Sequence, residues 1–171
     1  ACHDCPAGRY KGNTGQSQLS NCIECGSGKW GNVSGSSVAT DCTDCGAGKW
    51  SGTVGSSSEG NCIQCPAGFY KTSTGVASQA DCDPCVAGKY SGTLGSSAAT
   101  QCVLCMGGQY SPQEGADALS RCKPCAVGRK ANGDRTGCDD CAAGKYAPEG
   151  SGSCAQCPNG KFNTDSNQGH C

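Results

Sequence analysis

Large apolar side chains are sparse along the chain, and eight of the nine aromatic residues recur singly at a fixed place relative to the cysteines. At each of these places an aromatic residue follows a residue that is usually Lys or Arg, so a polar and an apolar side chain alternate over a short step. Such a step predicts a strand of two to four residues with one face inward. The aromatic residues are Tyr10, Trp30, Trp50, Tyr70, Tyr90, Tyr110, Tyr146 and Phe162. No segment has convincing helical periodicity, although 115–122 is expected to form one turn.

Two sets of glycines flank this step. One glycine follows a Cys by three positions and predicts a tight turn or a close backbone approach (Gly8, Gly28, Gly48, Gly68, Gly88, Gly108, Gly128, Gly144 and Gly160). A second glycine predicts the turn of a small hairpin (Gly15, Gly35, Gly55, Gly75, Gly95 and Gly115). The Asn or Asp before several later cysteines predicts a turn capped by its own side chain (Asn21, Asp41, Asn61 and Asp81).

The cysteines define a tandem repeat. Cys-x-x-Cys pairs begin every 20 residues from Cys2 to Cys122, and the spacing then shortens to 16 at Cys138 and Cys154. Each module runs from the second Cys of one pair to the first Cys of the next. The predicted modules are 5–22, 25–42, 45–62, 65–82, 85–102, 105–122, 125–138, 141–154 and 157–171. Since no stretch reads as a linker, one continuous array over 1–171 is expected.

Composition indicates what holds such an array together. The 171 residues include 19 Cys but only two Phe, two Trp and one Met, so apolar burial alone cannot offset the ordering of the backbone. A cysteine-rich scaffold of this kind indicates an oxidising, extracellular or cell-surface setting. The net charge of −1 carries no basic block, which argues against nucleic acid and anionic membranes as partners. No apolar run approaches the roughly 20 residues that span a bilayer.

Two interpretations of the cysteines compete. Cys-x-x-Cys spacing also fits zinc ribbons, but evenly spaced pairs give no natural grouping into fours, so disulfides are favoured and neither a metal nor another cofactor is expected. The simplest uniform pairing closes each module on itself: Cys5–Cys22, Cys25–Cys42, Cys45–Cys62, Cys65–Cys82, Cys85–Cys102, Cys105–Cys122, Cys125–Cys138, Cys141–Cys154 and Cys157–Cys171. Cys2 is left over. We expect it to bond an earlier segment of a longer chain or another subunit, with a free thiol as the alternative.

The step Cys-Pro-Ala-Gly-x-Tyr, at 5–10 and again at 65–70, resembles the ephrin-receptor-like cysteine-rich repeat. That repeat is similar to the wider tumour-necrosis-factor-receptor-like and growth-factor-receptor-like modules, and the resemblance extends over essentially the whole chain. It implies an elongated stack of small β-hairpins with one disulfide per module. Such modules occur in receptor ectodomains, adhesion proteins and flagellar hair proteins, so the resemblance implies a module type more than a function.

A small disulfide-rich repeat is therefore expected: a rod of nine β-hairpin modules with little helix and a minimal hydrophobic core. The leading hypothesis is an extracellular structural rod in a fibre, a flagellar hair (mastigoneme-like) or a cell coat, whose partners are copies of itself or neighbouring segments of a longer chain. The alternative is a ligand-binding or adhesion ectodomain of a receptor, with its ligand surface in 105–171.

Few other residues suggest chemistry. His3 and His170 lie at opposite ends of the chain, and no catalytic motif is present, so no enzyme activity is expected. Asn32, within Asn-Val-Ser, is the candidate for an N-linked glycan. Serines at predicted loop tips are candidates for O-linked sugars (Ser56, Ser57, Ser58, Ser96 and Ser97). The lysines before the aromatic residues are expected to be solvated.

Overall fold

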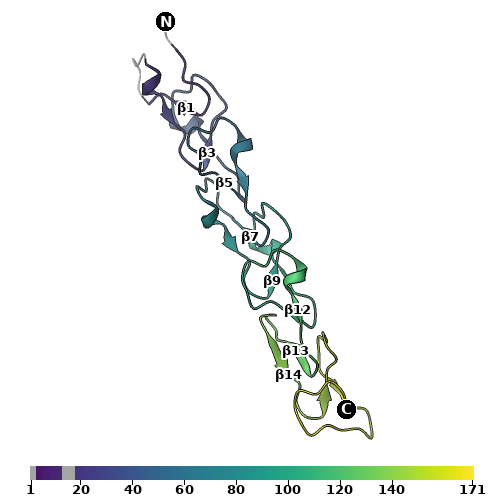
Figure 1. Ribbon diagram of the computed structural model, residues 1–171. Coiled ribbons are helices and arrows are strands. Elements are labelled where there is room, and N and C mark those ends of the chain that lie inside the picture. The colour runs from purple at the N-terminus through teal and green to yellow at the C-terminus, as the bar shows by residue number, and fades with distance from the viewer. Residues whose placement is uncertain (1–2, 13–17) are drawn as a thin grey trace. The chain divides into compact units, whose positions relative to one another are not determined.

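A computed structural model describes residues 3–12 and 18–171 of the chain (Figure 1). Within this part, the secondary structure consists of short strands and single turns of 3-10 helix, with no α-helix. The strands form eight two-stranded sheets. Few apolar side chains other than cysteines are buried. The expected fold class, a small disulfide-rich repeat of β-hairpins, is confirmed.

Each hairpin joins the aromatic step of a module to the residues just after the Cys that closes it. The pairs are β1 (Arg9–Tyr10) with β2 (Ile23–Glu24), β3 (Lys29–Trp30) with β4 (Thr43–Asp44), β5 (Lys49–Trp50) with β6 (Ile63–Gln64), β7 (Phe69–Tyr70) with β8 (Asp83–Pro84), β9 (Lys89–Tyr90) with β10 (Val103–Leu104), β11 (Gln109–Tyr110) with β12 (Lys123–Pro124), β13 (Arg129–Ala131) with β14 (Cys138–Asp140) and β15 (Lys145–Tyr146) with β16 (Ala155–Gln156). A whole disulfide loop therefore separates the two strands, and the second glycine lies within that loop instead of forming a tight hairpin turn.

The count of hairpins differs from the expected nine. Module 157–171 forms no strand pair among the described residues. The second strand of a hairpin begins at, or directly after, the Cys that closes its module.

Single turns of 3-10 helix precede the closing Cys of the six longer modules. They are η1 (Leu19–Asn21), η2 (Ala39–Asp41), η3 (Glu59–Asn61), η4 (Gln79–Asp81), η5 (Ala99–Gln101) and η6 (Leu119–Arg121). The last lies in the segment that was expected to form a turn. In η3 and η4 the cap is a serine that precedes the turn: Ser58 Oγ accepts from the Gly60 N–H at 3.1 Å, and Ser78 Oγ accepts from the Ala80 N–H at 3.2 Å. The prediction had assigned this role to Asn61 and Asp81.

Disulfides form the core of every module. The structure pairs Cys5–Cys22, Cys25–Cys42, Cys45–Cys62, Cys65–Cys82, Cys85–Cys102, Cys105–Cys122, Cys125–Cys138, Cys141–Cys154 and Cys157–Cys171. These are the pairs expected from closing each module on itself. Cys45, Cys65 and Cys85 have no exposed surface. Cys2 and its expected partner lie outside the described residues.

In six modules the first glycine is needed both for its turn and for a close contact. Gly48 has φ +76°, and a Cβ there would lie only 2.2 Å from the carbonyl oxygen of Gly95, two modules further along. Its N–H donates to the carbonyl of Lys71 in the module between them, at 2.8 Å. The same approach brings Gly8 to Gly55, Gly28 to Gly75, Gly88 to Asp134, Gly108 to Gly150 and Gly128 to Asn167. Each of these six modules thus packs against the next two, which confirms the predicted turn and close approach there.

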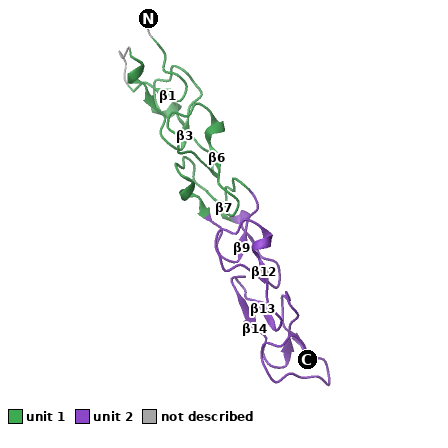
Figure 2. Ribbon diagram, viewed as in Figure 1, with its two compact units in different colours: residues 1–83, 94–99 green, residues 84–93, 100–171 purple. Residues whose placement is uncertain are grey.

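The chain forms two compact units, residues 1–83 with 94–99 and residues 84–93 with 100–171 (Figure 2). Segment 94–99 belongs to the first unit, because the Gly95 N–H donates to the Cys65 carbonyl and the Ser96 carbonyl accepts from the Lys71 N–H. The boundary between the units therefore falls inside module 85–102. No composition shift in the sequence marks it.

Candidate functional site

The candidate sites among the described residues lie on the protein surface. Across 3–12 and 18–171, no three His, Cys, Asp or Glu side chains are grouped so as to hold a metal ion. In the same part of the chain, no helix has the length and apolar character needed to cross a membrane. His3 uses its backbone carbonyl to accept from Lys11 Nζ at 3.3 Å, and His170 lines a small hollow with Tyr146 and Lys161.

One set of exposed aliphatic residues recurs in alternate hairpins along the sequence. In three hairpins an aliphatic residue of the second strand pairs with the aromatic residue of the first strand. These residues are Ile23 in β2, Ile63 in β6 and Val103 in β10, at 40-residue intervals. These side chains are 48%, 53% and 46% exposed. The same position holds the polar residue Thr43 in the hairpin between Ile23 and Ile63, and Lys123 in the hairpin after Val103. Alternate hairpins therefore present either an apolar or a polar side chain at one register position.

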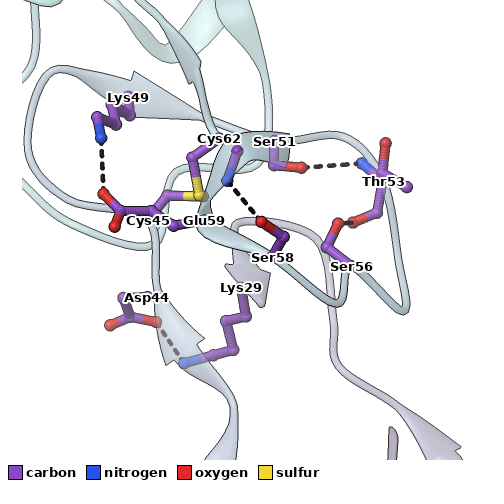
Figure 3. The surroundings of a disulfide bond; sticks show 11 residues. Lys29, Asp44, Cys45, Lys49, Ser51, Thr53, Ser56, Ser58, Glu59 and Cys62 are labelled. Carbon is purple, nitrogen blue, oxygen red and sulfur yellow. Dashed lines mark hydrogen bonds and ion pairs between the residues drawn. A yellow bond between two sulfur atoms is a disulfide. The ribbon is translucent and has the colours of Figure 1, made fainter. Parts of the chain in front are cut away.

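The other cross-strand pair of several hairpins is ionic. Lys29 Nζ pairs with Asp44 across β3 and β4 (Figure 3), and Arg9 Nη2 lies 2.5 Å from Glu24 Oε1 across β1 and β2. Lys49 Nζ instead lies 2.7 Å from Glu59 Oε1 within its own module. Lys29 and Lys49 are thus paired within the chain and not merely solvated, as had been expected.

The ion pair at Asp44 is linked to a neighbouring module. Thr74 Oγ1 donates to Asp44 Oδ2 at 3.4 Å, from the loop of module 65–82. The hydrogen bond from Lys29 is the main cause that lowers the pKa of Asp44 below its usual value. Desolvation of the carboxylate opposes this effect, while the positive charge of Lys29 and the hydrogen bond from Thr74 also lower the pKa. A carboxylate with a lowered pKa stabilises the fold above its ordinary pKa, and the contribution is lost as the pH falls through the lowered value.

Asp44→Asn should therefore lower the stability slightly at neutral pH. We expect a loss below about 1 kcal/mol, because both side chains are 43% exposed and water screens the pair. Thermal unfolding at pH 7 and at about pH 2 should show the difference between Asp44→Asn and the unaltered protein only at pH 7, and high salt should reduce it. An equal deficit at both pH values would contradict the assignment.

A cationic hollow lies in module 105–122. It has a volume of about 260 Å³ and is lined by Ser111, Pro112, Gln113, Ala116, Ser120, Arg121 and Lys123. Arg121 Nε donates to Asp117 Oδ1 at 2.9 Å, and this bond lowers the pKa of Asp117. The hollow lies in the segment where the alternative hypothesis placed a ligand surface.

The glycan candidates differ in exposure. Asn32 is exposed directly after β3 and stays a candidate. Ser57 and Ser58 are also exposed, whereas Ser56 is 2% exposed and Ser96 is fully buried. The carbonyls of Ser56 and Ser96 accept hydrogen bonds from the preceding module, which pulls these residues inward. Ser56 and Ser96 are therefore unsuitable as sugar acceptors, and that prediction is wrong for them.

The repeat also matches a known family. Residues 52–102 match the family model described as tyrosine-protein kinase ephrin type A/B receptor-like. A comparison with curated proteins finds no match to the chain. The matched segment includes the disulfides Cys65–Cys82 and Cys85–Cys102, and the same pairing recurs on both sides of it. Repeats of this type and the many disulfides point to an extracellular or cell-surface location. The chain is a cysteine-rich repeat protein whose segment 52–102 is ephrin-receptor-like.

Proposed function

We propose that the chain is an extracellular structural repeat that associates laterally with copies of itself in a fibre, a flagellar hair or a cell coat. The observation that carries this proposal is the exposed aliphatic side chain at one register position of alternate hairpins, Ile23, Ile63 and Val103. These side chains recur at 40-residue intervals, so a partner that contacts all of them needs matching groups at the same interval. Another copy of the chain has that interval, because its sequence is the same.

The strength of lateral association depends on how many of these contacts form together. Each of these side chains is about half exposed, so burying the exposed part against a partner contributes roughly 1 kcal/mol. One such contact is too weak for stable association. Several contacts on one chain act together, because each one made raises the effective concentration of the next. A laterally associated assembly therefore needs no deep binding site.

Replacing the three aliphatic residues together, Ile23→Ser, Ile63→Ser and Val103→Ser, tests the proposal. Sedimentation and electron microscopy of the disulfide-bonded chain should show that lateral association needs at least about tenfold more protein after the change. Thr43→Ser is the matched control, since it occupies the same register position in a hairpin without the aliphatic residue. The proposal is wrong if the triple variant associates laterally like the unaltered chain, or if that chain never does.

A receptor or adhesion ectodomain is the second candidate, and the cationic hollow of module 105–122 favours it. Arg121 and Lys123 place two positive side chains beside Ser111 and Ser120. The Arg121 guanidinium uses only Nε for Asp117 in its ion pair. The remaining N–H groups suit a carboxylate of an acidic partner segment.

An oligoglutamate peptide is a suitable probe of the hollow. Arg121→Ser with Lys123→Ser should weaken its binding about tenfold at low salt, since two charge contacts are lost. Arg129→Ser with Lys130→Ser is the matched control, because these cations pair with Asp140 and Asp139 outside the hollow. An equal loss in both double variants would show a diffuse charge effect and remove the support for this candidate.

A further inference from the structure

The disulfide of module 125–138 differs from those of the longer modules at its closing cysteine. In the six longer modules the closing cysteine is at most 8% exposed (Cys22, Cys42, Cys62, Cys82, Cys102 and Cys122). Cys138 exposes a larger fraction of its surface than any of these, whereas its partner Cys125 has no exposed surface. Both modules that follow 125–138 belong to the described structure, and Gly128 meets Asn167 in the second of them, so the exposure of Cys138 has a local cause.

The backbone before Cys138 explains this exposure. Each longer module places a turn of 3-10 helix directly before its closing cysteine, and the Cys122 N–H, for example, donates to the Leu119 carbonyl of its turn at 2.9 Å. Module 125–138 has no such turn. Its segment 132–137 is held instead by the Asn132 side chain, whose Oδ1 accepts from the Thr136 N–H at 3.0 Å and from the Gly137 N–H at 3.3 Å. Cys138 therefore lacks the turn that precedes the six buried closing cysteines.

The same segment holds a residue in a disfavoured backbone conformation. Arg135 has φ +60°, and it is one of two residues other than glycine with a positive φ in the described chain. That conformation is costly for any residue with a side chain. The Arg135 guanidinium has no ion pair among the described residues, and it lies three positions before Cys138 in the sequence. An exposed disulfide in a strained loop is more easily opened than a buried one, and a positive charge attracts thiolates to it.

We propose that Cys138 is the site at which a small-molecule thiol opens the Cys125–Cys138 bridge and becomes attached to the chain. The thiolate sulfur attacks Sγ of Cys138 and forms a mixed disulfide with it, while the bond between Cys138 and Cys125 breaks. The bonding electron pair leaves with Cys125 as a thiolate, which takes a proton from water. One disulfide replaces another, so this step has no net oxidation or reduction. Attack at Cys125 is disfavoured because that residue has no exposed surface.

Opening this bridge releases a loop that contacts two earlier modules of the same compact unit, 84–93 with 100–171. The Arg135 carbonyl accepts from the Ser111 N–H at 2.9 Å, and the Asp134 carbonyl oxygen lies 1.9 Å from the place of a Cβ at Gly88. Ser111 also lines the cationic hollow of module 105–122. Attachment of a thiol at Cys138 should therefore loosen the backbone at one wall of that hollow. The attachment site itself does not depend on the proposed lateral association.

Trapping with mercaptoethanol locates the site in the unaltered, disulfide-bonded chain. After a brief treatment at about pH 8, iodoacetamide blocks the free thiols and mass spectrometry of the peptides identifies each modified cysteine. We expect the mercaptoethanol adduct on Cys138 and the iodoacetamide label on Cys125, at least about tenfold faster than any adduct at Cys85–Cys102 or Cys105–Cys122. These two bridges are the matched comparison, because their closing cysteines are buried in the same unit. Adducts mainly on Cys125, or equal rates at the three bridges, overturn the proposal.

Substitutions at Arg135 test the contribution of the loop. Arg135→Gly removes both the disfavoured conformation and the positive charge, so it should slow adduct formation at Cys138 about threefold or more. Arg135→Lys is the matched control, because it keeps both, and it should react at the rate of the unaltered chain. No slowing in Arg135→Gly, or an equal slowing in the two variants, overturns the role of Arg135. An intact mass with all nine disulfides before treatment shows that each variant has folded.

Hydrogen exchange measures the effect of the attached thiol on the neighbouring module. With the adduct on Cys138, the Ser111 amide should exchange at least about tenfold faster, since it loses the Arg135 carbonyl as its acceptor. The Gly115 amide is the matched comparison, because it donates to the Cys85 carbonyl outside the released loop and should keep its protection. Equal protection of Ser111 with and without the adduct overturns the link between Cys138 and the hollow.

Discussion

Reduction of all nine disulfides should unfold every described module of the protein. Half-cystines are the largest group of buried side chains, and the other buried side chains, such as Ala147 and Ser96, are small. Each bridge closes a loop of 13 to 17 residues in sequence separation and stabilises its module by about 3 kcal/mol in the loop-entropy model. The sum of these contributions exceeds the roughly 5–15 kcal/mol by which a typical domain is stable.

Amide hydrogen exchange before and after reduction measures this effect. We expect the exchange protection of hairpin amides to disappear, with a mass increase of about two daltons per bridge as each sulfur gains a hydrogen. Replacing Cys65 and Cys82 by alanine is the local counterpart: protection should fall in module 65–82 and in the modules it contacts, and persist elsewhere. Protected amides in the fully reduced chain would show that packing alone maintains the fold.

Gly48→Ala should destabilise the first unit by about 2–5 kcal/mol, from the left-handed backbone and the steric overlap together. The φ of +76° disfavours any L side chain, and the new Cβ would lie 2.2 Å from the Gly95 carbonyl oxygen. Backbone atoms form that obstacle, so no rotamer change relieves it. The thermal midpoint of unfolding and hydrogen exchange in modules 45–62 and 65–82 measure the loss.

Two other glycines separate the causes. Gly46→Ala is the matched control in the same module, because Gly46 lacks a left-handed φ and has no neighbour within 4 Å of its Cβ position in the described structure. It should leave the thermal midpoint nearly unchanged. Gly144→Ala keeps a φ of +77° without the obstacle, so it should cost only about 1–2 kcal/mol. Equal effects at Gly48 and Gly144 would show that the contact with Gly95 contributes nothing.

Contacts between modules explain where the sequence-based predictions were wrong. Ser56 and Ser96 look like loop-tip residues, but their carbonyls bond the module before them and their side chains are buried. Lys29 was expected to be solvated, but it pairs with Asp44, which is 15 residues away in the sequence. The two meet because β3 and β4 pair across a whole disulfide loop. The alternation of Ile23, Thr43 and Ile63 is present in the sequence, but only the strand register shows that these residues share one position.

The sequence by itself determined the module length, the disulfide pairs, the two-residue strands and the need for glycine after each cysteine pair. These features follow from the spacing of residues within one module, and the repetition favours the same disulfide pairing in every module. The tertiary structure alone decided that a module packs against the two that follow it, as Gly48 does with Lys71 and Gly95. The reason is physical: these contacts join backbone groups roughly 23 and 47 residues apart, and backbone groups carry no sequence signal.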